Sequence, residues 1–386
     1  MSILGKILSL KHKFEKPFQT LNNIYISKNA VLNNFDIFQS MYPNYEIFPV
    51  LKSNAYGHGI KEIATILKQR KITYIVVDSY FEALKIQEIN DTKVLLIGYT
   101  LIENLKYINF KNISLVVYDI ETLKELTKIG KKVNIHIKID SGMHRQGIYI
   151  YELPKLLDII KIHKHINLEG VCSHLADADG IDNSYSLQQE ETFKKGIELI
   201  KNYGFSPKYI HLSNSAGSAK LFGNNYCNSI RLGIGLYGVN PLEETDNNYD
   251  KLAKLKLALS FYSTLILKKS LKKGEKVSYN GTFTAKYNMT IGIIPVGYYE
   301  GLSRKLSNNF EFYYKNSPLK ILGRICMNLT VIDLTGIDIN VGDKIEIISN
   351  SQDKSNNIYN LAEKSENITY ECLTRLSESV RREVVE

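Results

Sequence analysis

The sequence predicts an α/β protein in which an N-terminal (β/α)8 TIM-type barrel is followed by a mostly antiparallel β domain. A chain of 386 residues is longer than a single hydrophobic core usually supports. Its N-terminal part alternates short apolar runs with amphipathic segments, whereas its C-terminal part has apolar runs separated by glycine and asparagine. A polar, acidic stretch at residues 241–250 lies between the two patterns and has the composition of a linker.

The barrel is predicted from eight strand-like apolar runs with helical spacing between them. The expected strands are residues 46–51, 74–78, 94–99, 114–118, 133–139, 168–173, 209–213 and 229–237. The expected helices are residues 59–70, 80–90, 101–109, 120–130, 153–164 and 187–203. Unbroken alternation of this kind favours a closed barrel, although periodicity alone leaves an open doubly wound sheet as an alternative.

The second domain is predicted from strand-like runs without regular helices between them. These runs are residues 257–268, 289–296, 318–323, 329–334 and 343–349. A short helical stretch at residues 358–380 is expected to end the chain. We therefore expect a short basic arm at residues 1–20, the barrel at residues 21–245 and the β domain at residues 246–386.

Charge and hydropathy argue against nucleic-acid and membrane partners. The net charge of +9 comes from lysines spread along the chain rather than from a basic block. The apolar residues between Ile3 and Leu10 are too few and too interrupted for a secretory signal. No other apolar run approaches the length needed to span a membrane.

The four cysteines are far apart and form no CxxC pair. They are Cys172, Cys227, Cys326 and Cys372. This spacing argues against a zinc site and against a disulfide framework, so we expect no metal and a reducing compartment. The expected location is the cytoplasm.

A lysine stands where the first expected strand ends. The apolar run Ile47–Leu51 leads into Lys52 and then into the loop Ser53–Gly59, which is small, polar and rich in glycine. A lysine at the end of a buried strand is costly unless something neutralises or uses it. An imine with a carbonyl cofactor would use the amine, whereas the alternative is a strand-end lysine that reaches water.

Polar side chains follow the other expected strands as well, at the barrel end where catalytic groups gather. Tyr56 follows the first strand; Asp140, Arg145, His174, Asn214 and Ser215 follow later strands; and the last expected strand, 229–237, itself contains Arg231, followed by Gly233. Three of them have a structural alternative: a core histidine at 174, a carboxylate-paired arginine at 231, and a helix N-cap at Asn214. The expected strand 133–139 also has a polar face that includes Lys138, which needs a partner or a modification there.

These residues lie in motifs that resemble bacterial alanine racemase, a fold-type III pyridoxal-phosphate enzyme, from about residue 20 to about residue 380. The matching segments are Val50–Gly59, Met143–Gly147, Ser173–Leu175, Asn214–Gly217, Arg231–Gly238, Val277–Tyr279, Pro295–Tyr298, Gly323–Met327 and Tyr370–Glu371. The resemblance implies racemisation of L-alanine to D-alanine for peptidoglycan synthesis, with pyridoxal 5'-phosphate as cofactor. It also implies a homodimer whose subunits share each active site.

The resemblance further implies a role for each matching residue. Lys52 would bind the cofactor and act as one base, and Tyr279 from the partner subunit would be the other base. The cofactor-binding residues would be Lys52, Tyr56, His174, Asn214, Ser215, Arg231, Gly233, Ile234 and Tyr370. Arg145 and the Met327 amide would bind the substrate carboxylate. Lys138 matches a position where a lysine can be carbamylated and paired with the arginine at Arg145.

Three alternatives differ from this interpretation at identifiable residues. An amino-acid decarboxylase would place a carboxylate, not Arg231, at the cofactor ring nitrogen. A non-catalytic cofactor-binding barrel would lack the second domain. A serine or broad-specificity racemase is closer, but its periplasmic forms usually carry a signal peptide and paired cysteines, which this sequence lacks. Asn328, Leu232 and residues 299–304 depart from the family pattern near the substrate entrance and the phosphate turn, and these departures bear on substrate preference.

Overall fold

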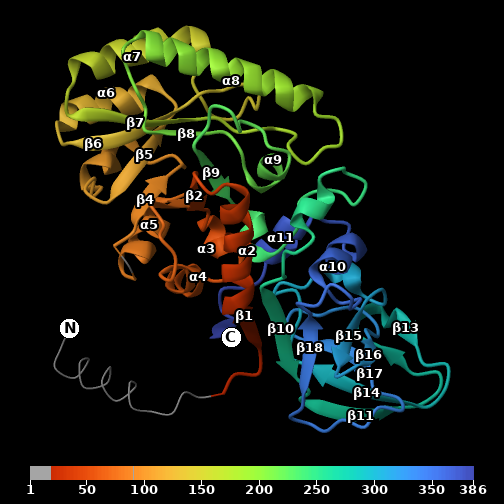
Figure 1. Ribbon diagram of the computed structural model, residues 1–386. Helices are drawn as coiled ribbons and strands as arrows, with labels where there is room; N and C mark the ends of the chain where they lie inside the picture. Colours follow the sequence, from red (N-terminus) through yellow and green to blue (C-terminus); the bar gives the residue numbers. More distant parts are fainter. Residues whose placement is uncertain (1–18, 90) are drawn as a thin grey trace, which may run out of the picture.

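The computed structural model describes residues 19–89 and 91–386, and most of the expected arm at residues 1–20 lies outside this range. Eight parallel strands form one sheet in the order β2-β9-β8-β7-β6-β5-β4-β3 (Figure 1). They are β2 (Glu46–Pro49), β3 (Tyr74–Val77), β4 (Lys93–Leu96), β5 (Ile113–Val117), β6 (Val133–Lys138), β7 (Ile166–Cys172), β8 (Tyr209–His211) and β9 (Ser229–Leu232).

The sheet closes on itself where β2 meets β3. Val50 pairs with Val76 in a parallel bridge, and the Leu51 amide donates to the Val76 carbonyl at 2.8 Å. Every expected barrel strand is present, so the prediction of a barrel is confirmed over the open sheet. Closure brings the carboxyl ends of all eight strands to one rim, where the site is expected.

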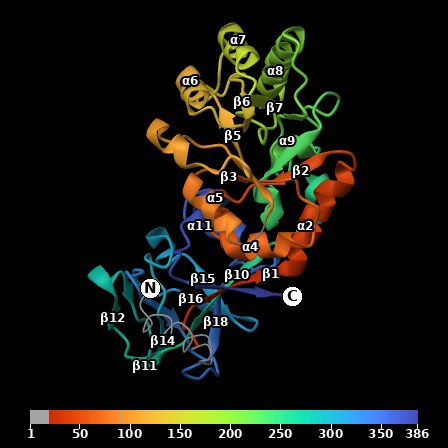
Figure 2. The ribbon, with the colours of Figure 1, turned by 90° about the vertical axis from the view of Figure 1, so that its left-hand side faces the viewer.

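Helices surround the barrel, as Figure 2 shows for α4 to α8. They are α2 (Lys28–Met41), α4 (Ile60–Leu67), α5 (Tyr80–Gln87), α6 (Ile120–Ile129), α7 (Leu153–Ile162), α8 (Ser184–Asn202) and the short α9 (Ser215–Ala219). The helix expected at residues 101–109 is instead a 3-10 segment, Ile102–Tyr107, in which Leu105 is the one buried residue. With so little apolar surface to bury, this segment gains little from a full α-helix.

The second part of the chain is built on a six-stranded sheet with the order β16-β15-β18-β10-β1-β19. Its strands are β16 (Ser317–Lys320), β15 (Glu311–Tyr314), β18 (Lys344–Ile348), β10 (Leu259–Thr264), β1 (Asn23–Ser27) and β19 (Arg381–Val385). A three-stranded sheet of β11 (Leu267–Leu271), β14 (Met289–Ile294) and β17 (Thr330–Asp333) and a hairpin of β12 (Lys276–Val277) and β13 (Phe283–Thr284) complete it. The expected mostly antiparallel domain is therefore present.

The two ends of the described chain meet in this second sheet (Figure 1). Strand β1 pairs in parallel with β19, although it lies within the range expected for the barrel. The expected helical ending is wrong in part: α10 (Ile358–Lys364) and α11 (Thr369–Thr374) form, but β19 follows them. Its sequence, RREVV, does not alternate between apolar and polar residues. The strand lies at a sheet edge, where all five of its residues are half-buried or exposed, so neither face needs to be apolar.

Hydrophobic packing is continuous between the barrel helices and the second sheet. A separate small cluster, which includes Phe48, Tyr74 and Tyr209, fills the barrel interior with edge-to-face ring contacts. None of the helices in the described range has the length and apolar composition that crossing a membrane requires. Residues 19–89 and 91–386 also contain no group of three or more His, Cys, Asp or Glu side chains arranged to hold a metal ion.

Candidate active site

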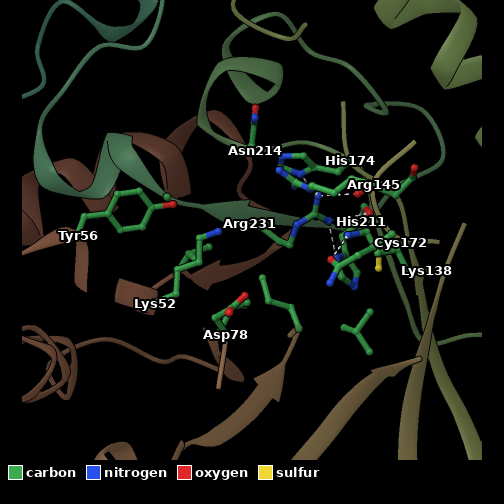
Figure 3. Close-up of a pocket in the computed structure, with 17 residues that line it drawn as sticks. Lys52, Tyr56, Asp78, Lys138, Arg145, Cys172, His174, His211, Asn214 and Arg231 are labelled. Atoms are coloured by element: carbon green, nitrogen blue, oxygen red, sulfur yellow. Dashed lines mark hydrogen bonds between the residues drawn. The ribbon is translucent and has the colours of Figure 1, made fainter. Parts of the chain in front are cut away.

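A cavity of about 480 Å³ opens at the carboxyl ends of the barrel strands (Figure 3). The lining residues are Val50, Lys52, Tyr56, Val76, Asp78, Ile97, Val116, Lys138, Arg145, Gln146, Cys172, Ser173, His174, His211, Asn214, Arg231 and Gly233. Eight of the residues predicted from sequence lie among them: Lys52, Tyr56, Lys138, Arg145, His174, Asn214, Arg231 and Gly233. Polar residues from different strand ends therefore converge on one volume.

Lys52 begins an unusual turn. The four residues after it, Ser53 to Tyr56, all have φ between 52° and 55°, so the backbone makes a left-handed helical turn. Each non-glycine residue in this conformation costs roughly 1–2 kcal/mol, so the turn must be held from outside. Glu82 accepts from the Ser53 amide at 2.6 Å, and the Asn54 side chain accepts from the Ile60 amide at 2.9 Å. The turn places both Lys52 and Tyr56 on the cavity wall.

Arg231 is buried, yet none of the ion pairs in the described range includes it, which rules out the carboxylate-paired alternative. Its Nη1 donates to the His211 Nδ1 and carbonyl at 2.7 and 2.9 Å. Its Nη2 donates to the carbonyls of Ser173 and Leu212 at 2.6 and 2.8 Å and lies 3.2 Å from His174 Nδ1. Burial lowers the pKa of Arg231, although a guanidinium stays charged in proteins. The side chain is thus a fixed, buried cation at the cavity.

The two histidines beside Arg231 are neutral. Burial, followed by the charge of Arg231, holds the pKa of His174 and that of His211 well below the usual range. Both can therefore accept hydrogen bonds from the guanidinium at neutral pH.

A narrow cradle forms around Ser215. Its Oγ accepts from the amides of Gly233 and Gly235, each at 3.1 Å. A Cβ at Gly233 would lie 2.9 Å from the Tyr56 hydroxyl, so only glycine leaves this space open. The Tyr56 ring lies 6.1 Å from that of Tyr370 on α11. The alternative for Asn214 is also correct, because its side chain caps α9 by accepting from the Gly217 amide at 2.9 Å.

The cavity is strongly positive. Lys52, Lys138, Arg145 and Arg231 line it, and Asp78 is the one carboxylate among the lining residues in the described range. The Lys138 amine donates to Gln146 Oε1 at 3.1 Å, which supplies the expected partner. Burial, together with the charges of Arg231, Arg145 and Lys52, lowers the pKa of Lys138. This balance of charge favours an anionic ligand.

Tyr279 and Met327 do not line the cavity of their own chain. They are 65% and 54% exposed. Tyr279 is held on a strained turn, because Ser278 and Asn280 on either side have φ of 63° and 61°. The Ser278 hydroxyl fixes this turn by donating to the Arg324 carbonyl at 2.6 Å. Tyr298, Tyr299 and Leu329 are further exposed apolar or aromatic side chains of the same domain.

Two of the departures from the family pattern contact each other. The Asn328 amide donates to Glu300 Oε1 at 2.8 Å, and the Gly297 amide donates to Glu300 Oε2 at 2.7 Å. Because Asn328 follows Met327 directly, this pair holds the segment that carries the Met327 amide.

Four polar residues of the cavity wall were not among the residues predicted for the site: Asp78, Gln146, Ser173 and His211. Asp78 is the last residue of the expected strand 74–78 and directly follows β3, so the strand-end rule would have found it. His211 lies within its strand, and its inward direction depends on the barrel closing.

Comparisons with known proteins agree with this arrangement. A family model described as the N-terminal domain of alanine racemase matches residues 26–241, and one for the C-terminal domain matches residues 258–384. The chain is 33% identical to the alanine racemase of Borreliella burgdorferi, over 94% of this chain and 97% of that protein. It is 36% identical to that of Leptospira interrogans, over 94% and 95%. Among solved structures, alanine racemase from Bacillus anthracis with bound L-Ala-P has a TM-score of 0.88 at 30% identity, covering 96% of each chain.

Proposed function

The chain belongs to the alanine racemase family and is a pyridoxal-phosphate-dependent enzyme that interconverts L- and D-alanine, and we propose which of its residues carry out that reaction. The cell-wall role of the family, supply of D-alanine, comes with this membership. When bound, pyridoxal phosphate withdraws electrons from the substrate and acidifies the proton on its α-carbon. The protein must then bind, orient and exchange that proton.

The cavity suits this cofactor in size, charge and shape. Its volume of about 480 Å³ is typical of small-molecule sites, and its cations match a phosphate and a carboxylate. The Ser215 cradle, which a Cβ at Gly233 would fill, is the observation that carries the assignment. The proposed phosphate-binding residues are Tyr56, Ser215, Gly233, Ile234 and Tyr370.

The remaining cofactor contacts follow from the same arrangement. Lys52 would hold the cofactor covalently through its Nζ. Arg231 would donate to the ring nitrogen from Nε–H, because its five hydrogen bonds all use Nη1 and Nη2. His174 and Asn214 complete this set as neutral polar walls of the cavity.

Two bases on opposite faces of the α-carbon exchange its proton in this proposal. Lys52 Nζ serves one face from within the cavity, and Tyr279 Oη of a second copy serves the other. Arg145 and the Met327 amide of that second copy hold the substrate carboxylate. The neutral His174 and the cationic Arg231 would lie beside the incoming Tyr279 and favour its phenolate form.

A homodimer is proposed because the second base lies on the outer surface of its own chain. Tyr279 and Met327 are both more than half exposed, and other exposed side chains of the domain are aromatic or apolar. A strained turn that presents an exposed tyrosine is expected at a functional position rather than on a free surface. A second copy that covers this surface would complete each cavity.

We also propose that Lys138 is carbamylated. Its lowered pKa leaves more of the amine neutral, and the neutral amine can add carbon dioxide with release of one proton. The new carboxylate would then pair with Arg145 and orient it toward the substrate.

A location in the cytoplasm is proposed from the thiols. All four cysteines are free, as expected in a reducing compartment. Racemase activity measured in osmotic-shock and cytosolic fractions tests this location, and activity released by osmotic shock would contradict it.

The activity itself is tested by chiral chromatography of the purified protein with pyridoxal phosphate. L-alanine, L-serine and L-lysine are incubated separately, beside a Lys52→Ala control. We expect alanine to approach an equal mixture of enantiomers and the control to lose this activity. Equal turnover of serine or lysine would contradict a preference for alanine and direct attention to Asn328.

A further inference from the structure

A row of buried polar side chains leads from the cavity into the barrel interior and ends at a carboxylate. Arg231 Nη1 lies 2.7 Å from His211 Nδ1, as Figure 3 shows at its cavity end. His211 Nε2 lies 2.9 Å from His136 Nδ1, and His136 Nε2 lies 3.7 Å from Glu169 Oε2. All four side chains are buried. We call Arg231, His211, His136 and Glu169 the polar row.

The polar row has a single allowed direction of hydrogen bonding. A guanidinium can only donate, so His211 Nδ1 must accept. Burial lowers the pKa of His211 and of His136, so both rings are neutral and carry one proton each. His211 therefore donates from Nε2 to His136 Nδ1. The His136 proton is then on Nε2, which makes no hydrogen bond and faces Glu169 Oε2 at 3.7 Å, a charge–dipole contact. The row runs from a cation to an anion through two oriented dipoles.

Two features of the backbone make room for this arrangement. Strand β7 bulges at Glu169, because Ile135 pairs with Leu168 whereas His136 pairs with Gly170. A bulge gives one residue a new direction at a local cost in pairing. Gly170 is the second feature, since a Cβ there would lie 2.3 Å from His136 Nδ1. The bulge directs the Glu169 side chain, and the missing Cβ at residue 170 leaves room for the His136 ring.

Glu169 stays ionised in the barrel interior. Burial alone raises its pKa, but the contacts of His136 and Tyr74, together with the charge of Lys93, lower it to about 2. Tyr74 and Ser114 donate to Oε2, the latter at 3.2 Å, and Lys93 Nζ lies 4.0 Å from Oε1. The carboxylate thus provides a permanent negative end for the row.

We propose that Glu169 is a positioning residue for the racemase reaction, which acts on Arg231 through the proton positions of His136 and His211. The proposal rests on the role given above to Arg231. With Glu169 charged, the two imidazoles keep the orientation in which both Nη groups of Arg231 are occupied and Nε is left for the cofactor. Without that charge, the tautomer with the proton on His136 Nδ1 becomes accessible. His211 then loses its acceptor and holds Arg231 less firmly.

The test compares Glu169→Gln with Tyr74→Phe. The first variant removes the charge and nearly keeps the shape, and the second removes one hydrogen bond to Glu169 and keeps the charge. Solid-state 15N NMR of histidine-labelled apoenzyme and holoenzyme reads the tautomers directly, and the chain has only eight histidines. We expect protonated Nε2 at His136 and His211 in the wild type and in Tyr74→Phe, with mixed tautomers in Glu169→Gln. We also expect kcat to fall roughly tenfold in both directions in Glu169→Gln while KM changes less than about twofold.

Several outcomes would overturn the proposal. Protonated Nδ1 at His211 in the wild-type protein would contradict the proposed direction of hydrogen bonding along the polar row. This measurement does not depend on any variant folding. A Glu169→Gln protein that melts at a lower temperature, with unchanged tautomers and kcat, would show that Glu169 only supports the fold. Failure of the role given to Arg231 would look different. The tautomers would be as expected in the apoenzyme, yet kcat would be insensitive to both Arg231→Lys and Glu169→Gln.

Discussion

Two inactive variants of this enzyme should restore activity when they share one dimer. Lys52→Ala removes the base within the cavity, and Tyr279→Phe removes the base that a second copy would supply. Each change should reduce turnover by about 10²–10⁴-fold, because each removes one positioned proton-transfer group. In a mixed dimer, one of the two sites combines the intact Lys52 of one subunit with the intact Tyr279 of the other.

The expected recovery can be calculated. Random reassociation gives mixed dimers as about half of the total, and each has one intact site of two, so activity should return to about a quarter of wild type in the mixture and about half in the isolated mixed dimers. The assay mixes differently tagged subunits after mild denaturation, isolates mixed dimers by both tags and follows D-alanine formation. Lys52→Ala mixed with the double variant is the matched control, since no intact site can form. Recovery no greater than in this control would refute a site shared between subunits.

Four further outcomes are expected. Gly233→Ala should weaken binding of pyridoxal phosphate about tenfold, measured by titrating the apoenzyme, because the added Cβ meets the Tyr56 hydroxyl at 2.9 Å; unchanged affinity would argue against the phosphate cradle. If Lys138 is carbamylated, removal of bicarbonate should lower activity and its return should restore it, and an intact-mass or 13C NMR measurement without a carbamate signal would contradict this. Asn328→Asp should raise KM for alanine several-fold with little change in kcat, because it sets a second carboxylate against Glu300 and displaces the Met327 amide. Equal KM values would show that Asn328 does not influence substrate binding. Burial lowers the pKa of His58 to about 4. Below about pH 6.5 His58 therefore binds a proton in the unfolded chain but not in the folded protein. This residue alone should lower the free energy of unfolding by about 1.4 kcal/mol per pH unit between pH 6.5 and 4. Urea unfolding of wild type and His58→Gln should show a shallower pH dependence in the variant, and equal slopes would contradict the assignment.

Local patterns predicted the barrel well because each strand there is buried on both faces. Runs such as YIVV in β3 and ISLVV in β5 are wholly buried, so their composition alone marks them as strands. The same reasoning failed at residues 101–109, where the apolar spacing suggests a helix but a single side chain is buried. It also missed β19, whose charged residues form a strand because β1 offers a partner.

The residues of the candidate site likewise fall into those that local sequence identifies and those that only the fold brings together. Lys52, Arg145, His174 and Asn214 were identified because each follows an apolar run, and a parallel barrel brings strand ends together whatever their sequence separation. Glu169 and His136 were not identified as partners, because a bulge and a missing Cβ bring them together rather than any spacing along the chain.

The sequence by itself determined which segments form the barrel strands and which chemical groups follow them, because burial and periodicity act over a few neighbouring residues. Only the tertiary structure decided that Arg231 lacks a directly bound carboxylate, that the turn after Lys52 is left-handed and that Tyr279 lies outside its own cavity. These features depend on contacts between residues far apart in the chain, whose energies exceed local preferences once the barrel has closed.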